Sequence, residues 1–297
     1  MTYAMPRSSH SNRDGVIRLA KTALKRLLDV LAPSAGTSAP GRYFSERVTT
    51  RTMDRHRAVS HHGVRLSFTT PTALNEYRAE SFASKEPETL EWIDAIPEGS
   101  VVWDIGANVG LYSCYAAKAR GCRVFSFEPS VFNLELLARN IALNGLTDRV
   151  TIVPLPLSDR LGVSTLKMVT TEWGGALSTF GKDFGHDGAP MQRVFAFGTV
   201  GLTMGDAIER LGVPQPDFVK MDVDGIEHLI LAAGLPVLRQ VKSVLVEIND
   251  RFTEQAEASH RALTDAGFTM TAKKHAPYFD TLEGDPAQFT FNQIWTR

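Results

Sequence analysis

From residue 101 onward, short apolar runs alternate with amphipathic segments of helical length. The apolar runs cover residues 101–103, 123–127 and 150–157, and helices are expected over 111–120 and 131–143. A run that is apolar at every position, such as the first, is typical of a strand covered by helices on both faces. A β-α-β-α-β order requires a parallel sheet with right-handed crossovers, and such sheets bind ligands at the carboxyl ends of their strands. We therefore predict an α/β fold with a doubly wound, mostly parallel sheet.

A polar turn, D-I-G-A-N-V-G at 104–110, follows the first strand. Gly106, Asn108 and Gly110 let the backbone lie close to a ligand, with the N-terminus of a helix behind it. The G-x-N-x-G spacing differs from the G-x-G-x-x-G of dinucleotide-binding folds. Asp104 would repel a pyrophosphate but would favour a cationic amine or sulfonium. The turn therefore suits S-adenosyl-L-methionine better than NAD.

Acidic residues also follow the next two strands. Glu128 has the position of a carboxylate that accepts hydrogen bonds from ribose hydroxyls, a device that NAD-binding folds share. Asp159 could accept a hydrogen bond from the adenine amine, while Ser158 could form a hydrogen bond with the edge of the adenine ring. Each acid alone has a structural alternative as a helix cap or a surface charge. Their occurrence at three successive strand ends favours a binding site.

Five motifs occur in order: DIGANVG, FEP, LSD, FVKMDVDGIE and VLVEIN. Together they resemble the FkbM-type branch of class I S-adenosylmethionine-dependent methyltransferases over about residues 84–297. The resemblance implies a Rossmann-like seven-stranded sheet whose last two strands include an antiparallel edge. It also implies O-methylation of a hydroxyl, commonly on a sugar or a secondary metabolite. Family members often have Glu where this chain has Asp224. By the resemblance, the residues around the cofactor are Asp104, Gly106, Asn108, Gly110, Glu128, Ser158 and Asp159.

The residues after the third strand, about 160–202, exceed what a minimal class I domain needs. Strand-like alternation over 163–169 and 193–197 flanks a glycine-rich stretch that we expect to be mobile. Loops on a rigid scaffold usually carry specificity, so the acceptor substrate is expected here. Trp173 is a candidate stacking surface for a sugar, with plain packing as its structural alternative.

Candidate catalytic residues lie near the predicted fourth strand, 218–222. Methyl transfer is an in-line displacement at carbon, so the protein must align the reactants, and a weakly acidic alcohol needs a base or an orienting group. Asp222 is the first choice as base, and Lys220 and Glu247 follow as orienters or proton partners. Lys220 and Asp222 share one face of the strand, and they could instead merely pair or cap the next helix. His228 is a further candidate near the substrate.

The first part of the chain has a different character. Residues 1–60 carry eleven Lys or Arg against four Asp or Glu, although the whole chain has a net charge of −1. Residues 1–31 are expected to contain a basic amphipathic helix, and the small, Pro- and Gly-containing segment 32–41 is expected to be a linker. Packing on its own domain or on a second subunit is commoner for such a helix than attachment to a membrane surface. Nucleic acid is not an expected partner because the rest of the chain is acidic.

A hairpin around His62-Gly63 is predicted within 42–83, a region that otherwise has irregular character and would cover the 84–297 domain. His61 and His62 are adjacent, and neighbouring strand residues point to opposite faces, with no carboxylate at ligand spacing. Asp222, Asp224 and Glu227 miss the spacing of an EF-hand loop. We therefore expect no metal site.

No apolar run approaches the roughly 20 residues that span a bilayer, and cations interrupt the amino-terminal segment where a signal peptide would be apolar. We expect a cytoplasmic enzyme that transfers a methyl group from S-adenosyl-L-methionine to a small-molecule or glycan acceptor. Two other functions stay open: an NAD(P)-dependent oxidoreductase and a non-catalytic S-adenosylmethionine-binding module.

Overall fold

The computed structural model describes residues 22–23, 25–26, 29, 36–276, 279–281 and 286–297. The chain divides into two units, Met1–Arg55 and His56–Arg297. The first contains α2 (Ala39–Met53), which begins where the Ser38 side chain accepts a hydrogen bond from the Gly41 N–H. This helix starts inside the segment predicted to be a linker. Ser38 at the N-cap and Pro40 in the first turn are both residues that favour the start of a helix. Residues 22–23, 25–26 and 29 are helical, whereas the rest of the helix predicted within 1–31, and residues 32–35 of the linker, lie outside the described residues.

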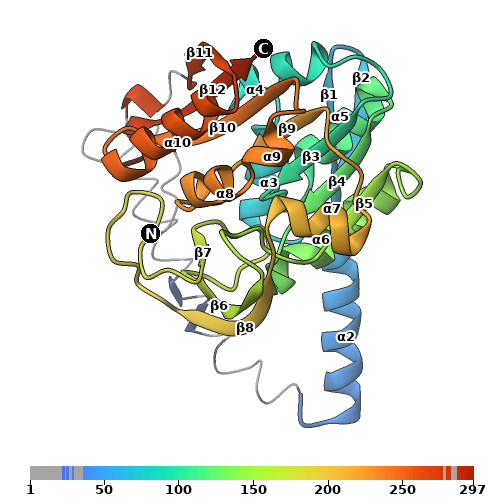
Figure 1. The fold of residues 1–297 in the computed structure, drawn as a ribbon. Helices are drawn as coiled ribbons and strands as arrows, with labels where there is room; N and C mark the ends of the chain where they lie inside the picture. Colours follow the sequence, from blue (N-terminus) through green and yellow to red (C-terminus); the bar gives the residue numbers. More distant parts are fainter. Residues whose placement is uncertain (1–21, 24, 27–28, 30–35, 277–278, 282–285) are drawn as a thin grey trace. The chain divides into compact units, whose positions relative to one another are not determined.

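The second unit is built on a seven-stranded sheet (Figure 1). Its strands are β3 (Val101–Ile105), β4 (Arg123–Phe127), β5 (Val150–Val153), β9 (Phe218–Met221), β10 (Ser243–Asn249), β11 (Thr269–Lys274) and β12 (Thr290–Thr296). The spatial order is β11-β12-β10-β9-β3-β4-β5. The five strands from β10 to β5 are mutually parallel, and β12 is antiparallel to both of its neighbours. The predicted doubly wound, mostly parallel sheet is confirmed, and the antiparallel strand lies between β10 and β11 rather than outermost.

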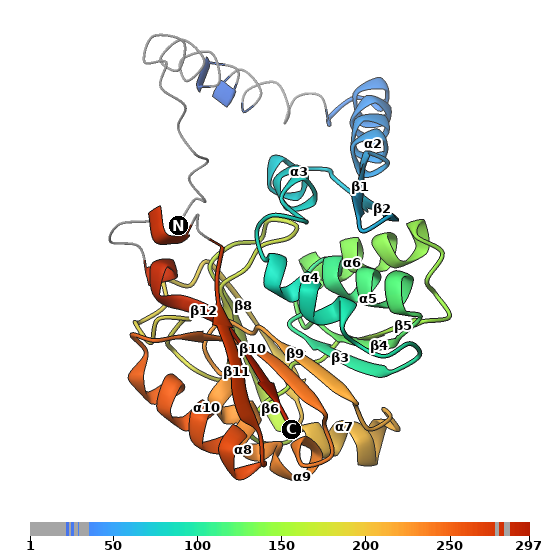
Figure 2. The same ribbon diagram turned by 90° about the horizontal axis from the view of Figure 1, so that it is seen from above.

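Helices cover both faces of this sheet, as Figure 2 shows. One face carries α4 (Pro87–Asp94), α5 (Leu111–Arg120) and α6 (Val131–Leu143); the other carries α7 (Met204–Leu211), α8 (Glu227–Ala233), α9 (Leu235–Leu238) and α10 (Thr253–Asp265). Successive residues of β3 serve the two sides: Val102 joins the core under α4–α6, whereas Trp103 and Ile105 join the core under α7–α10. Burial on both sides explains why residues 101–103 of this strand are apolar at every position. Within the described part of the chain, no helix combines the length and the apolar character needed to cross a bilayer.

Two smaller sheets complete this unit. β1 (His56–His61) and β2 (Val64–Thr69) form the predicted hairpin. The region expected to be irregular contains a further helix, α3 (Ala73–Glu80), which begins where Thr72 accepts a hydrogen bond from the Asn75 N–H. The predicted insertion forms a separate antiparallel sheet of β6 (Gly162–Met168), β7 (Ser178–Phe180) and β8 (Phe195–Gly201). Short 3-10 helices, η1 (Phe279–Thr281) and η2 (Pro286–Phe289), precede β12.

The third strand of the sheet is shorter than its apolar pattern predicts. β5 ends at Val153, and Pro154 and Pro156 follow it. Proline has no N–H to donate to a neighbouring strand, so regular pairing stops there. After a bend at Leu155, the chain reaches Leu157, which forms an isolated bridge with Leu202.

Candidate active site

The turn after β3 lies against the end of β9. Gly106 has φ +84°, and a Cβ there would lie 1.8 Å from the backbone oxygen of Asp222. Gly110 has φ +82°, and a Cβ there would lie 2.4 Å from Leu137 Cδ1 of α6. Both glycines are therefore required by close packing as well as by their backbone conformation. The predicted cofactor turn and the predicted catalytic strand are neighbours.

Glu128, at the end of β4, holds this turn in place. Its Oε2 accepts a hydrogen bond from the Asn108 N–H at 2.8 Å, and its Oε1 accepts one from the Ser130 N–H at 2.7 Å. Burial raises the pKa of Glu128 to about 7, although the two backbone donors act in the opposite direction. The structure thus brings together Asn108 and Glu128, which are twenty residues apart in the sequence.

Asp104 is a buried anion with one oxygen engaged and one without a hydrogen bond. Its Oδ2 accepts from Ser113 Oγ at 2.5 Å, whereas Oδ1 has no hydrogen-bond partner among the described residues. The nearest cation to Oδ1 is the Lys220 ammonium, 3.7 Å away. This ammonium lies beyond hydrogen-bond distance, and a buried carboxylate oxygen without a hydrogen-bond donor is costly. It therefore fits the amine of an amino-acid-bearing cofactor.

Lys220 is the centre of a buried charge cluster. Its Nζ lies 3.5 Å from Asp222 Oδ2 and 5.3 Å from the centre of the Tyr112 ring. Burial works against the ammonium, but Asp222, Asp104, Glu86 and Glu247 together raise the pKa of Lys220 above its ordinary value. The side chain therefore stays protonated at neutral pH. It can neutralise and orient carboxylates but cannot serve as a base.

Two members of this cluster carry opposite pKa shifts. Glu86 is buried, but an ion pair with Lys85 at 2.6 Å and the charge of Lys220 overcome that burial and lower its pKa to about 2. Glu247 lies on β10, and burial together with the charges of Asp222 and Glu86 raises its pKa well above the ordinary value. Glu86 is thus ionised at neutral pH, whereas burial and the neighbouring anions favour the protonated form of Glu247. Asp222, whose side chain is 29% exposed, and Glu247, which is also partly exposed, are the carboxylates of the cluster that an entering molecule can reach.

The residues after β9 bind the insertion. Asp224 has φ +61°, and its Oδ2 accepts from the N–H groups of Leu177 and Ser178. Burial and the neighbouring charge of Asp222 raise the pKa of Asp224 to about 6. Glu227 is buried and accepts from the N–H groups of Val223 and Gly225. The first acid positions the insertion, and the second closes the turn that leads into α8.

The glycine-rich segment 173–175, expected to be mobile, is tied down at every residue. Asn75 donates to the Trp173 carbonyl, and Arg78 donates to the Gly174 carbonyl. The Gly174 N–H donates to Asn133 Oδ1. The Gly175 carbonyl accepts from the side-chain amides of Asn108 and Asn133, at 2.9 and 3.1 Å.

This segment therefore connects the turn after β3, α6 and α3. Sequence reasoning did not identify Asn75, Arg78 or Asn133. Single polar residues on amphipathic helices carry no pattern that distinguishes them from solvent-facing ones.

The remaining predicted site residues have mainly structural contacts. Ser158 is buried, donates its N–H to the Leu202 carbonyl and donates its hydroxyl to Asp159 at 3.1 Å. His228, in the first turn of α8, packs its ring edge-on against Phe252 at 5.7 Å, and burial lowers its pKa. The contacts described for His228 do not bring it to Lys220 or Asp222. Its place beside the substrate stays a prediction, as do the cofactor contacts of Ser158 and Asp159.

Comparisons with known proteins agree with this geometry. A family model described as "Methyltransferase FkbM domain" matches residues 104–270. The chain is 26% identical to the hexuronic acid methyltransferase AglP of Haloferax volcanii over 190 residues, which cover 63% of this chain and 72% of that protein. It is 25% identical to the 31-O-demethyl-FK506 methyltransferase FkbM of Streptomyces tacrolimicus over 201 residues, covering 59% of this chain and 75% of that protein.

Solved structures were compared as well. A precorrin-6y C5,15-methyltransferase from Geobacter metallireducens aligns with a TM-score of 0.41 and 17% identity, covering 74% of this chain and 88% of its own. A putative SAM-dependent methyltransferase from Streptococcus mutans aligns with a TM-score of 0.45 and 10% identity, covering 82% and 55%. The family model spans more than half of the chain and begins at Asp104, the first residue of the turn that lies against Asp222. The chain therefore belongs to the FkbM methyltransferase family.

Proposed function

We propose that this methyltransferase uses S-adenosyl-L-methionine to methylate a hydroxyl group on a sugar-containing or secondary-metabolite acceptor. The observation that carries the proposal is the unsatisfied, buried Oδ1 of Asp104 beside the Lys220–Asp222 pair, at the adjoining ends of β3 and β9. An anionic edge of this kind favours a cationic sulfonium cofactor over a pyrophosphate, which argues against the NAD(P) alternative.

The cofactor-binding residues would be those around the first turn. Asp104 would meet the cationic amine, and Glu128, already holding the Asn108 N–H, would face the ribose. Gly106 and Gly110 keep the turn free of side chains there. Ser158 and Asp159 are proposed for the adenine. When bound, the cofactor supplies a methyl group activated by a positively charged sulfur.

Asp222 is the proposed base or orienting group for the acceptor hydroxyl. The Lys220 ammonium already holds its proton, and burial with the neighbouring anions favours the protonated form of Glu247, so both groups are disfavoured as proton acceptors. Asp222 is partly exposed and lies 3.5 Å from the Lys220 ammonium. Glu247 could donate a hydrogen bond, and Lys220 would keep Asp222 oriented. Asp222 would then hold the hydroxyl in line with the methyl group and take its proton as the C–O bond forms.

The acceptor class rests on the relatives and on the insertion. One matched relative is named for a hexuronic acid, and the other for a demethylated FK506. Because Asp224 and Asn133 hold the insertion against the residues that follow β9 and β4, its residues are in position to contact an acceptor. Trp173 remains the proposed stacking surface, and His228 a more distant contributor.

Calorimetry with S-adenosylhomocysteine and with NAD(P) tests the cofactor. Binding of S-adenosylhomocysteine alone supports the proposal. Binding of NAD(P) alone would contradict it and favour an NAD(P)-dependent oxidoreductase. Labelled donor with uronic acids, glycans and a fractionated extract, followed by mass spectrometry, identifies the acceptor.

The catalytic assignment is tested with Asp222→Asn. We expect turnover to fall about 10²- to 10⁴-fold, with Glu257→Gln as the control. Glu257 is an exposed acid of α10 that pairs with Arg261. Cofactor binding without turnover on any acceptor would favour a binding module.

A further inference from the structure

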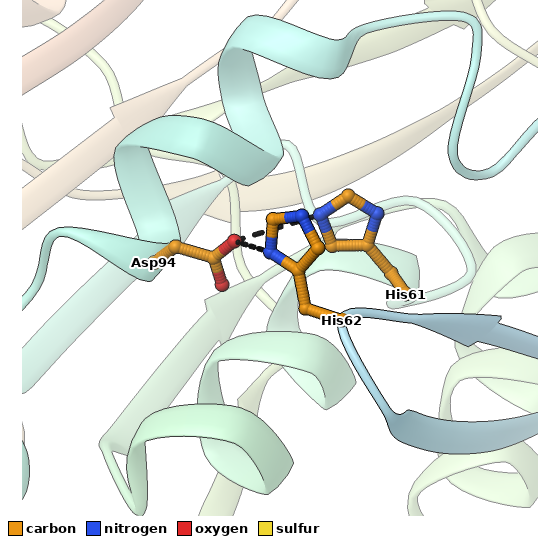
Figure 3. A group of neighbouring side chains, drawn as sticks. All are labelled: His61, His62 and Asp94. Carbon is orange, nitrogen blue, oxygen red and sulfur yellow. Dashed lines mark hydrogen bonds and ion pairs between the residues drawn. The ribbon is translucent and has the colours of Figure 1, made fainter.

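A second group of ligand-type side chains lies outside the methyltransferase site, where the β1–β2 hairpin meets α4. It consists of His61, the last residue of β1, His62 in the hairpin turn, and Asp94, the last residue of α4 (Figure 3). One nitrogen of each imidazole and one carboxylate oxygen all lie within 4.8 Å of one another. His62 Nδ1 is 2.7 Å and His61 Nε2 is 3.5 Å from Asp94 Oδ2.

The backbone of the turn explains why two adjacent histidines point the same way. Alternation along a strand would place them on opposite faces. His62, however, has φ +44° and is followed by Gly63 with φ +81°, two positive values in a row that are typical of a tight hairpin turn. The two rings consequently lie 4.0 Å apart with their planes inclined by 30°. The sequence argument against a shared site was wrong on this point, and the carboxylate it lacked comes from Asp94, thirty-two residues away.

A buried tyrosine supports the carboxylate from behind. Tyr115 of α5 donates its hydroxyl to Asp94 Oδ1 at 2.6 Å, which leaves Oδ2 directed at the two imidazoles. The ring of Tyr115 also packs edge-on against His61 at 5.5 Å. Outer groups that orient ligands in this manner are characteristic of built metal sites.

His61 contributes the most specific observation. Its Nε2 is shielded from solvent and has no hydrogen-bond partner among the described residues. This nitrogen lies 3.5 Å from Asp94 Oδ2, an oxygen that already has a hydrogen bond to His62 Nδ1. A buried nitrogen of this kind needs a partner, and an ion placed between it and the carboxylate would supply one.

We propose that His61, His62 and Asp94 bind one divalent transition-metal ion of the zinc class. Two imidazole nitrogens and a carboxylate oxygen suit Zn²⁺, and tetrahedral bonds of about 2.0–2.1 Å place ligand atoms roughly 3.3 Å apart. The observed separations of 2.7 and 3.5 Å lie on either side of that value. His62 is 69% exposed, so the fourth position opens to solvent. The ion would join the hairpin to α4 and, through Tyr115, to α5.

The test uses the full chain, untagged and stripped with a chelator, and adds Zn²⁺ alone. Calorimetry should find one ion per chain at this site, and Zn²⁺ should raise the melting temperature. His62→Gln and Asp94→Asn should each weaken binding at least tenfold and abolish the thermal shift. Asp94→Asn keeps an oxygen for the Tyr115 hydroxyl, and His62 is exposed, so both variants retain the surrounding packing. Binding of S-adenosylhomocysteine serves as the check that each variant is folded.

His275→Gln is the matched control. His275 lies 2.9 Å from Asp280, a pair with one imidazole and one carboxylate but no second histidine in the described contacts. This variant should bind Zn²⁺ like the unmodified chain. Absence of binding by the unmodified chain, or equal binding by His62→Gln and Asp94→Asn, would overturn the proposal and leave a histidine–carboxylate ion pair.

Discussion

Gly106 and Asp222 are in backbone contact: a Cβ on the glycine would lie 1.8 Å from the carbonyl oxygen of the aspartate. This contact joins the turn after β3 to the end of β9, and thus the proposed cofactor site to the proposed base. Both parts must shift if either one changes. The geometry at this one glycine therefore links stability to activity.

Gly106→Ala should destabilise the protein by about 2–5 kcal/mol, because it combines a positive φ with a clash against backbone. Gly99→Ala is the matched control, since Gly99 also has a positive φ (+75°) but nothing lies within 4 Å of its Cβ position. Urea unfolding of both variants measures the difference. Equal losses would show that backbone conformation, and not the contact with Asp222, is what requires glycine at 106.

Lys220→Met should lower the free energy of unfolding by about 3 kcal/mol, because it leaves Asp104 buried without its cation. Adding Asp104→Asn to this variant should restore part of the loss, since the uncompensated charge is then removed. A double-mutant cycle by urea unfolding gives the coupling between the two residues. Strictly additive losses would contradict the ion-pair account.

Glu227→Gln should make stability less dependent on pH. The pKa of Glu227 is raised from 4.5 to about 7 in the folded state, first by burial, so the folded chain holds a proton that the unfolded chain has released. Its contribution is complete below about pH 4.5 and is lost as pH rises through about 7, on the order of 3 kcal/mol at most. Unfolding at pH 5.5 and pH 8 should show a smaller decrease for Glu227→Gln than for the unmodified chain or the exposed Glu257→Gln control. An unchanged decrease would mean that Glu227 is not the titrating group.

Asn133→Ala should loosen the segment 173–175, because it removes two hydrogen bonds worth about 1 kcal/mol each. Amide hydrogen exchange of peptides covering this segment should accelerate about tenfold or more. Arg139→Ala is the control on the same helix, as Arg139 is half-exposed and pairs with Glu135. If exchange stays slow in Asn133→Ala, the hydrogen bonds from Asn75, Arg78 and Asn108 are sufficient to hold the segment in place.

Elements with a regular pattern were predictable from sequence, because the cause of each is local. Residues 101–103 of β3 are all apolar because both faces of the strand are buried, and α7 begins at the Thr203 capping box and ends at Gly212. The candidate cofactor residues followed from the same logic: parallel strands present their carboxyl ends on one edge, so Asp104 and Glu128 were expected at the same edge of the sheet. Lys220 and Asp222 were found because alternation places them on one face.

Only the tertiary structure determined which distant groups meet. Glu86, the residue just before α4, interacts electrostatically with Lys220. Asn75 and Asn133 form hydrogen bonds with the segment 173–175. Asp94 lies beside two histidines whose relative direction depends on the positive φ of His62. None of these pairings has a sequence period, because each depends on how helices pack across the sheet. The residue pattern by itself predicted the order of strands and helices along the chain. The charge cluster and the candidate metal ligands depend on contacts between elements far apart in the chain, which only the tertiary structure determines.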